Sequence, residues 1–188
     1  LMNAQGEDVV AGIRTPNHYL GMPPNLSQGK QTAFVINEVE DILLEEKPDI
    51  CISFSDGNPS VYVLAATKNN MKVAHIESGM RSWDWRMPEE KNRRLVDSIS
   101  DILFCPNHIA AGNLLKENVH AEKIHISGKL IADVVDKYHK MIDESRALNK
   151  FSLDKKDYIL VELHRPENVE NEKNLYNIIK GIDLAIKE

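Results

Sequence analysis

Short runs of β-branched and other apolar residues alternate with longer amphipathic stretches from Asn25 onward. This alternation is typical of strands and helices that follow one another as βαβ units, and it predicts an α/β fold with a parallel sheet. Strands of a parallel sheet are covered on both faces, so their sequences are nearly all apolar. Four runs meet this description and are predicted to be strands: Asp49–Ser55, Lys72–Glu77, Asp101–Pro106 and Lys123–Ser127.

The stretches beside these strands are predicted to be helices, because their apolar residues recur at helical spacing. Asn58 directly precedes a proline, so we expect it to be the N-cap of the second helix. The expected helices are Gln28–Glu46, Pro59–Asn69, Glu89–Ser100, Asn107–Glu117 and Leu130–Ile142.

A polar, weakly periodic segment at residues 143–156 is interpreted as a linker between two domains. Residues 1–142 are assigned to an N-terminal Rossmann-like domain that ends in an interdomain helix. Residues 143–188 are assigned to the linker and the start of a second domain, with a strand at Tyr158–Leu163, a loop, and a helix at Asn174–Ile186. One strand and one helix cannot complete a sheet, and no strand precedes the first helix, so we expect both domains to be partial.

Composition excludes several classes of function. The 188 residues carry a formal net charge of -6, with lysines and arginines scattered among acids, which argues against a nucleic-acid partner. No apolar run approaches the roughly 20 residues of a membrane span, and no basic-then-apolar leader opens the chain, so we expect a cytoplasmic protein without a membrane segment. Cys51, Cys105 and the dispersed histidines lack the spacing of metal ligands, so no metal is expected.

Acidic residues follow the predicted strands at the point where ligands bind in open parallel sheets, beyond the carboxyl ends. Asp56 comes directly after the first strand. A helix cap is the structural alternative for Asp56, although Asn58 is expected to fill that role, and both interpretations stay open here.

Glu77 closes the second strand, and Gly79 shortly after it allows a close approach of backbone. Partial burial would suit such an acid to proton transfer, although a solvated acid at a strand end is a serious alternative. His75 points to the same face as Glu77, and a buried histidine with satisfied hydrogen bonds is the more common role for such a residue.

Two acids, Glu89 and Glu90, open the third predicted helix. A purely structural account is available, because acids favour the first turn of a helix and each acid has an arginine four residues later. Helical spacing places Glu89 on the inward stripe with Asn92, whereas Glu90 is expected to face solvent with Arg94 and Asp97. Glu89 is therefore the better candidate for a cleft.

The loop after the predicted strand of the second domain contains His164, Arg165, Glu167 and Asn168. These side chains would face the first domain across an interdomain cleft, where ligands commonly bind. An ordinary polar loop is the alternative.

Taken in order, these segments resemble the non-hydrolysing UDP-N-acetylglucosamine 2-epimerases. HIESGMRS followed by RMPEEKNRR is similar to the family's H-x-E-x-G-x-R and P-E-E-x-N-R segments, SGKLIADVV to its glycine turn, and LHRPEN to its His-Arg loop. The chain departs from the family pattern at Ser55-Asp56-Gly57, where Gly-Asp-Thr is usual, and at Pro166.

The resemblance implies a GT-B fold of two doubly wound Rossmann-like domains with a UDP-sugar bound between them, no cofactor and a homodimer. It implies that Asp56, Glu77 and Glu89 are the acid/base carboxylates and that His164 contacts the substrate or the departing diphosphate. The implied substrate-binding residues are Arg81, Asn92, Arg165, Glu167 and Asn168.

The implied reaction is epimerisation at C2 of UDP-N-acetylglucosamine or a related UDP-acetamido sugar, by elimination and re-addition of UDP. A hydrolysing 2-epimerase, a GT-B glycosyltransferase and a non-catalytic nucleotide-binding module remain alternatives. From the helix-face argument we expect Glu89→Gln to abolish epimerisation and Glu90→Gln to leave it largely intact.

Overall fold

The computed structural model describes residues 15–155 and 158–186. The chain separates into two compact units, the first ending at Asp136 and the second beginning at Lys137. The division falls inside one helix, α5 (Leu130–Asp143). Each unit is described by itself.

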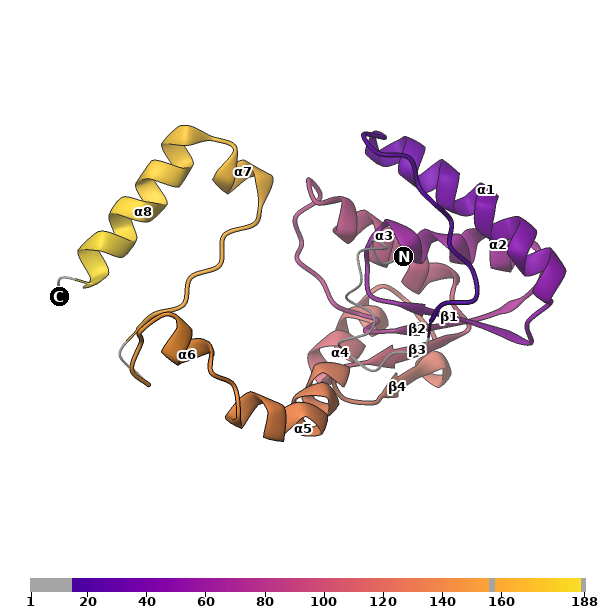
Figure 1. Cartoon of the computed structure of the whole chain (residues 1–188). Coiled ribbons are helices and arrows are strands. Elements are labelled where there is room, and N and C mark those ends of the chain that lie inside the picture. The colour runs from indigo at the N-terminus through magenta and orange to yellow at the C-terminus, as the bar shows by residue number, and fades with distance from the viewer. Residues whose placement is uncertain (1–14, 156–157, 187–188) are drawn as a thin grey trace. The chain divides into compact units, whose positions relative to one another are not determined.

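The first unit contains a parallel sheet whose strands lie in chain order (Figure 1). Each observed strand lies within its predicted range, which confirms the α/β class and the parallel sheet. The strands are β1 (Ile50–Phe54), β2 (Lys72–Ile76), β3 (Ile102–Cys105) and β4 (Ile124–Ile126).

The helices of the first unit also follow the prediction closely. The stretch predicted at Pro59–Asn69 divides into a 3-10 helix and a short α-helix, and Asn58 lies inside the 3-10 helix with Gly57 as its N-cap, so the predicted cap is wrong. The side chain of Asn58 instead donates to Gln28 and Gln31 at 2.6 and 2.7 Å. The elements are α1 (Gln28–Glu46), η2 (Asn58–Tyr62), α2 (Val63–Lys68), α3 (Pro88–Ile99), α4 (His108–Lys116) and η3 (Ala121–Lys123).

One face of the sheet forms the core. Strand register aligns Ser53 with His75 and His75 with Leu103, and these three side chains are buried. Residues of α1 to α4 pack into two clusters with this face. On the other face of β1, Ile52 and Phe54 are 58% and 55% exposed, so β1 is not covered on both faces as predicted. Buried and exposed residues alternate along β1 because the described helices pack against only one side of this strand.

The second unit contains α6 (Ala147–Lys150), α7 (Pro166–Val169) and α8 (Glu172–Ile186) after the end of α5. The predicted strand at Tyr158–Leu163 is wrong: the segment joins no ladder, and Leu160 is 85% exposed. A strand needs a neighbour for its backbone hydrogen bonds, and the described part of this unit has no strand to offer one. The predicted loop after it contains α7.

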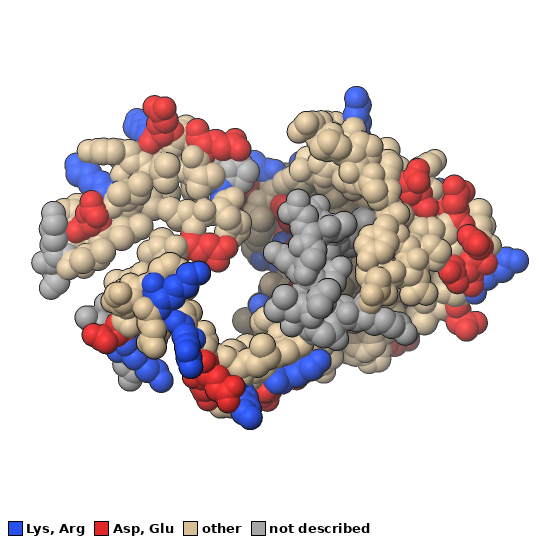
Figure 2. Space-filling model, viewed as in Figure 1, with Lys and Arg blue, Asp and Glu red and all other residues tan. Residues whose placement is uncertain are grey.

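Charged side chains are mixed over the visible surface. On the face shown in Figure 2, lysines and arginines lie among aspartates and glutamates and do not gather into one basic patch. No helix in the described ranges is long and apolar enough to cross a membrane.

Candidate active site

The first two strands end in the same unusual backbone conformation. Ser55 follows β1 with a φ of 66° and Glu77 follows β2 with a φ of 67°, both in the left-handed region. Because Phe54 pairs with Ile76, these two residues lie next to each other at the carboxyl edge of the sheet. A left-handed conformation costs a non-glycine residue of the order of 1 kcal/mol and is concentrated at functional sites. The turns place Asp56 and Glu77 at the edge where the sequence predicts a site.

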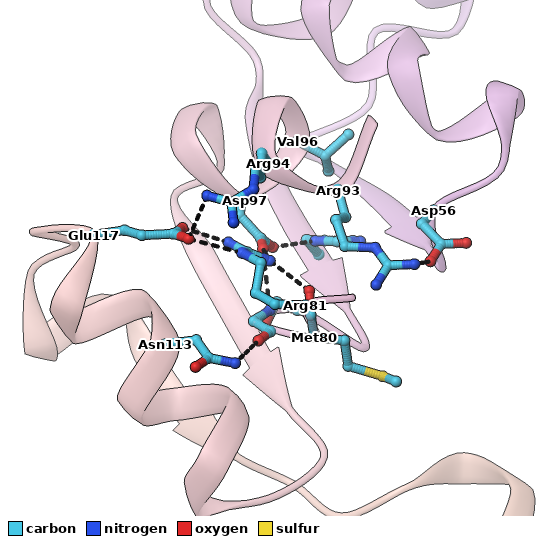
Figure 3. Close-up of polar contacts among 12 residues, drawn as sticks. Asp56, Met80, Arg81, Arg93, Arg94, Val96, Asp97, Asn113 and Glu117 are labelled. Carbon is cyan, nitrogen blue, oxygen red and sulfur yellow. Dashed lines mark hydrogen bonds and ion pairs between the residues drawn. The ribbon is translucent and has the colours of Figure 1, made fainter. Parts of the chain in front are cut away.

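Two side chains of α3 bind Asp56. Arg93 forms an ion pair with its carboxylate (Figure 3). The side-chain amide of Asn92 donates to the backbone carbonyl of Asp56 at 3.0 Å. Asn92 also donates to the Asn58 side-chain oxygen at 3.1 Å. In this structure Asn92, predicted to bind substrate, therefore fixes the loop that carries Asp56.

Glu90 is fully buried, so the prediction that it faces solvent is wrong. Its carboxylate accepts hydrogen bonds from the Ser82 backbone N–H at 2.9 Å, the Ser82 hydroxyl at 3.0 Å and Arg94 at 2.9 Å. The loop between β2 and α3 folds back over this side of the helix, a long-range contact that helical spacing alone does not reveal. Asp97, expected on the same solvent face, is buried too.

The surroundings of Glu90 fix its charge. Burial acts to raise the pKa of Glu90, but the hydrogen bonds from Ser82 and the hydrogen bond and charge of Arg94 outweigh it, so the pKa lies below its ordinary value. Glu90 is thus an anion at neutral pH that ties the β2–α3 loop to the helix, and it is unsuited to exchanging protons in that range.

Glu77 and Glu89 differ from the buried, hydrogen-bonded Glu90. Both are partly exposed, and within the described ranges neither carboxylate makes a hydrogen bond or ion pair. Carboxylates with no fixed partner are available to take up or release a proton of a ligand. The structure therefore separates Asp56, which is paired, from Glu77 and Glu89, which are not.

Arg81 is buried and committed to the protein. It binds Glu117 through Nε at 2.9 Å and Nη2 at 2.5 Å, and its Nη1 donates to Asp97 and to the Met80 carbonyl, both at 2.7 Å (Figure 3). Burial acts to lower the pKa of Arg81, but the hydrogen bonds and charges of Glu117 and Asp97 raise it above its already high ordinary value. The structure places Arg81 in the support of the loop, and direct substrate binding by this residue stays a prediction.

His75 is a buried histidine with both ring nitrogens hydrogen-bonded, as the common structural role predicts. Nδ1 lies 2.7 Å from Asp97 Oδ1 and Nε2 lies 2.9 Å from the Ser55 carbonyl oxygen. The other Asp97 oxygen accepts from the Gly79 N–H at 3.0 Å. A Cβ at Gly79 would lie 2.3 Å from the Ala110 carbonyl oxygen, which confirms the close backbone approach predicted there.

Two tryptophans project from the loop between Glu77 and Glu89. Trp83 and Trp85 are each 59% exposed, and their ring centroids lie 5.0 and 4.8 Å from the Arg94 guanidinium carbon. Arg94 also binds Glu117 at 2.8 Å, so the loop, α3 and α4 meet at this arginine.

Of the predicted site residues of the second unit, His164 and Arg165 lie in the exposed segment before α7, and Glu167 and Asn168 lie within α7. His164 lies 3.3 Å from Glu162, and Arg165 lies 3.7 Å from Glu167. The side chain of Asn174 donates to the Glu167 carbonyl at 2.8 Å, which ties α7 to α8, and Asn168 is partly buried. The described residues contain no cluster of three or more acidic, histidine or cysteine side chains that could hold a metal ion.

A family model described as UDP-N-acetylglucosamine 2-epimerase matches residues 2–188. The chain belongs to this family. It is 39% identical to the UDP-N-acetylglucosamine 2-epimerase of Methanococcus maripaludis over 180 residues, or 94% of this chain and 49% of the relative. It is 36% identical to the UDP-2,3-diacetamido-2,3-dideoxy-D-glucuronate 2-epimerase of Pseudomonas aeruginosa over 176 residues, or 92% of this chain and 48% of that relative.

A solved structure resembles the chain over nearly its whole length. The UDP-GlcNAc 2-epimerase of Methanocaldococcus jannaschii, crystallised in complex with UDP-GlcNAc and UDP, has 37% sequence identity and a TM-score of 0.84, and the match covers 96% of this chain and 50% of that one. The likeness confirms the predicted GT-B-like fold class. This chain spans about half the length of the 2-epimerases that it matches.

The resemblance implies glycine at the position of Ser55, and the backbone of this chain would suit glycine there. The φ of 66° at Ser55 is reached by glycine without steric cost. In this chain the turn forms with serine, and Asp56 lies next to the end of β1.

Sequence reasoning missed the ionic network that supports the site. Arg93 was predicted only as a partner of Glu89, yet it pairs with Asp56, and Glu117 was not singled out although it binds Arg81 and Arg94. The arginines of RMPEEKNRR could have indicated that this helix forms several ion pairs. Glu117 lies 36 residues from Arg81, and no local pattern connects them.

Proposed function

We propose that this chain is the acid-bearing part of an enzyme that inverts C2 of UDP-N-acetylglucosamine, or of a related UDP-acetamido sugar, to the manno configuration. One observation carries the proposal: the strand-end turns of a 2-epimerase family member present Asp56 and Glu77 at one edge, and Glu77 and Glu89 have no side-chain partner among the described residues, which suits them to proton transfer. The UDP-GlcNAc and UDP bound to the Methanocaldococcus relative support a UDP-sugar substrate.

The reaction needs both a base and an acid. The C2 proton has no adjacent carbonyl to stabilise a carbanion, so the enzyme removes this proton while the C1–O bond to UDP breaks, which leaves a 2-acetamidoglucal. UDP then adds back at C1 and a proton is delivered to the opposite face of C2. Glu77 and Glu89 fit the base and acid roles because no residue in the described ranges pairs with their carboxylates, while Asp56 is held in place by Arg93.

The leaving diphosphate requires cations or hydrogen-bond donors. His164 and Arg165 supply both on one exposed loop, and guanidinium binds phosphate oxygens with paired hydrogen bonds. We assign these two residues to the diphosphate, with Glu167 and Asn168 as neighbouring substrate contacts. No metal or redox cofactor takes part in this scheme.

The product of the reaction tests the proposal. The complete protein that carries this sequence is incubated with UDP-GlcNAc, and the sugars are separated by chromatography. A mixture of UDP-GlcNAc and UDP-ManNAc is expected. Free ManNAc with released UDP would instead identify a hydrolysing epimerase, and transfer of the sugar to an acceptor would identify a glycosyltransferase.

Calorimetry with UDP tests whether the chain is a binding module. We expect weak binding to residues 1–188 and tighter binding to the complete protein. Tight binding to this chain together with absence of turnover by the complete protein would favour a non-catalytic module.

We also propose that the protein acts in the cytoplasm as a homodimer. Cys51 and Cys105 are buried as free thiols, a state suited to a reducing compartment. Burial raises the pKa of both thiols, which keeps them protonated and unreactive. Light scattering after size-exclusion chromatography of the complete protein measures its mass, and a monomer at micromolar concentration would contradict the dimer.

A further inference from the structure

We infer that His75 is a buried imidazolium that acts as a positioning residue, because its pair with Asp97 fixes both of the turns that carry the candidate acids. Both ring nitrogens of His75 lie within hydrogen-bond distance of an oxygen atom. Nε2 faces the Ser55 carbonyl oxygen at 2.9 Å and Nδ1 faces Asp97 Oδ1 at 2.7 Å. His75 is completely buried, so water does not provide an alternative partner.

Both partners of the ring are acceptors. A carbonyl oxygen has no proton to donate, so Nε2 must carry one. The other Asp97 oxygen already accepts from the Gly79 N–H at 3.0 Å and from Arg81 at 2.7 Å, which stabilises the carboxylate as an anion. Nδ1 must then carry a proton as well, since an unprotonated nitrogen would set its lone pair against a carboxylate oxygen. The ring bears two protons and a positive charge.

The charges around the pair agree with this state. The ion pairs that continue from Asp97 join four acids to three arginines, so a positive charge on His75 balances the network. The acids are Asp56, Glu90, Asp97 and Glu117, and the arginines are Arg81, Arg93 and Arg94. Cys105 adds a neutral thiol beside Asp97. A buried imidazolium offsets the charge that Asp97 brings into the core, and burial of an unpaired charge is costly.

The positions of these contacts give the pair its role. His75 holds the carbonyl of Ser55, the residue immediately before Asp56, and Asp97 holds the N–H of Gly79, two residues after Glu77. Both turns contain a left-handed non-glycine residue, which the backbone would relax without external support. One buried pair therefore braces both acid-bearing turns against the core.

Nitrogen NMR of ¹⁵N-histidine-labelled protein tests the protonation of the ring on this chain. The other six histidines are partly or fully exposed, so the ring N–H signals that survive exchange with water identify His75. At neutral pH an ordinary histidine is mostly uncharged, whereas here we expect a directly bonded proton on both ring nitrogens. A proton on only one nitrogen would overturn the inference.

Asp97→Asn is the matched variant for this measurement. Its amide can donate to Nδ1 while its carbonyl accepts from Gly79 and Arg81, so every hydrogen bond survives with an uncharged ring. We expect Nδ1 to lose its proton and Nε2 to keep it. Two protons on the ring of the variant would contradict the assignment of the charge to the pair with Asp97.

The positioning role rests on the proposed function and is tested by kinetics of the complete protein. Glutamine at position 75 cannot donate in two opposite directions, so His75→Gln should lower kcat about 10- to 100-fold per folded molecule with KM changed less than about threefold. His120→Gln, on the exposed surface of the same unit, should match the wild type. Unchanged kcat in His75→Gln would overturn the role.

The NMR measurement and the kinetic measurement can be judged independently of each other. If the complete protein does not epimerise UDP-acetamido sugars, the proposed function is wrong while the NMR result still decides the charge of the ring. If His75→Gln does not fold, the wild-type spectrum remains decisive for that charge.

Discussion

Glu89 and Glu90 are neighbours in sequence with opposite surroundings, and the contrast gives a prediction at the scale of single residues. Glu90→Gln removes a buried charge bound by Ser82 and Arg94, so we expect a loss of the order of 3 kcal/mol in the free energy of unfolding. Glu89→Gln should change stability by less than about 0.5 kcal/mol while abolishing epimerisation, because Glu89 has no partner to lose among the described residues. Urea denaturation and turnover measure the two effects.

The lowered pKa of Glu90 also predicts how stability depends on pH. Its contribution is fully present above the unfolded-state pKa of about 4.3 and is lost as the pH falls through the lower folded-state value. Unfolding free energy measured from pH 6 downward should therefore fall less steeply in Glu90→Gln than in the wild type. Parallel curves would show that other carboxylates account for the acid sensitivity.

Ser55 offers a test of the strained turn. Ser55→Gly relieves the left-handed backbone at φ 66°, and we expect it to be neutral or stabilising by up to about 1 kcal/mol with activity retained. Ser55→Val, with a β-branched side chain in the same conformation, should be destabilising by a few kcal/mol, roughly the cost of a bulky residue at such a backbone position. Thermal denaturation of the pair is the measurement, and a glycine variant less stable than valine would contradict the strain argument.

At the scale of elements, Gly79 sets the distance between the β2–α3 loop and α4. Gly79→Ala would force its Cβ against the Ala110 carbonyl, 2.3 Å away, so the loop must shift and we expect a loss of the order of 3 kcal/mol in unfolding free energy. Gly112→Ala within α4 is the control: open space surrounds its Cβ position, and better helix propensity should stabilise the protein by about 0.5–1 kcal/mol.

The elements were largely predictable from sequence because their signal is local. Periodicity placed β1 to β4 and α1 correctly, since the spacing of apolar residues reflects burial within each element. The strand predicted at Tyr158–Leu163 was wrong because a strand forms only when a neighbouring strand accepts and donates its backbone hydrogen bonds. The burial of Glu90 was missed because Ser82 and the returning loop, rather than the helix, decide which face is covered. The candidate acids came from strand ends and from the resemblance, while the network through Glu117 depends on tertiary contacts.

At the scale of the whole molecule, the two units differ in how they are stabilised. Both apolar clusters found among the described residues belong to the first unit, whereas α6 and α8 of the second unit contain no buried residue. We expect limited trypsin digestion to cut first at Arg146 or Lys150, which are exposed at the two ends of the short helix α6. Mass spectrometry identifies the fragments, and early cleavage at Lys123 within the first unit would contradict this order.

The tryptophan-bearing loop gives the protein an intrinsic optical label. The chain has two tryptophans, and both Trp83 and Trp85 lie in the loop between Glu77 and Glu89, stacked near the guanidinium of Arg94. Emission excited at the indole band therefore reports almost entirely on this loop. A shift in emission wavelength or in quenching by iodide on addition of UDP-sugars would follow events at the candidate acids directly, without any attached dye.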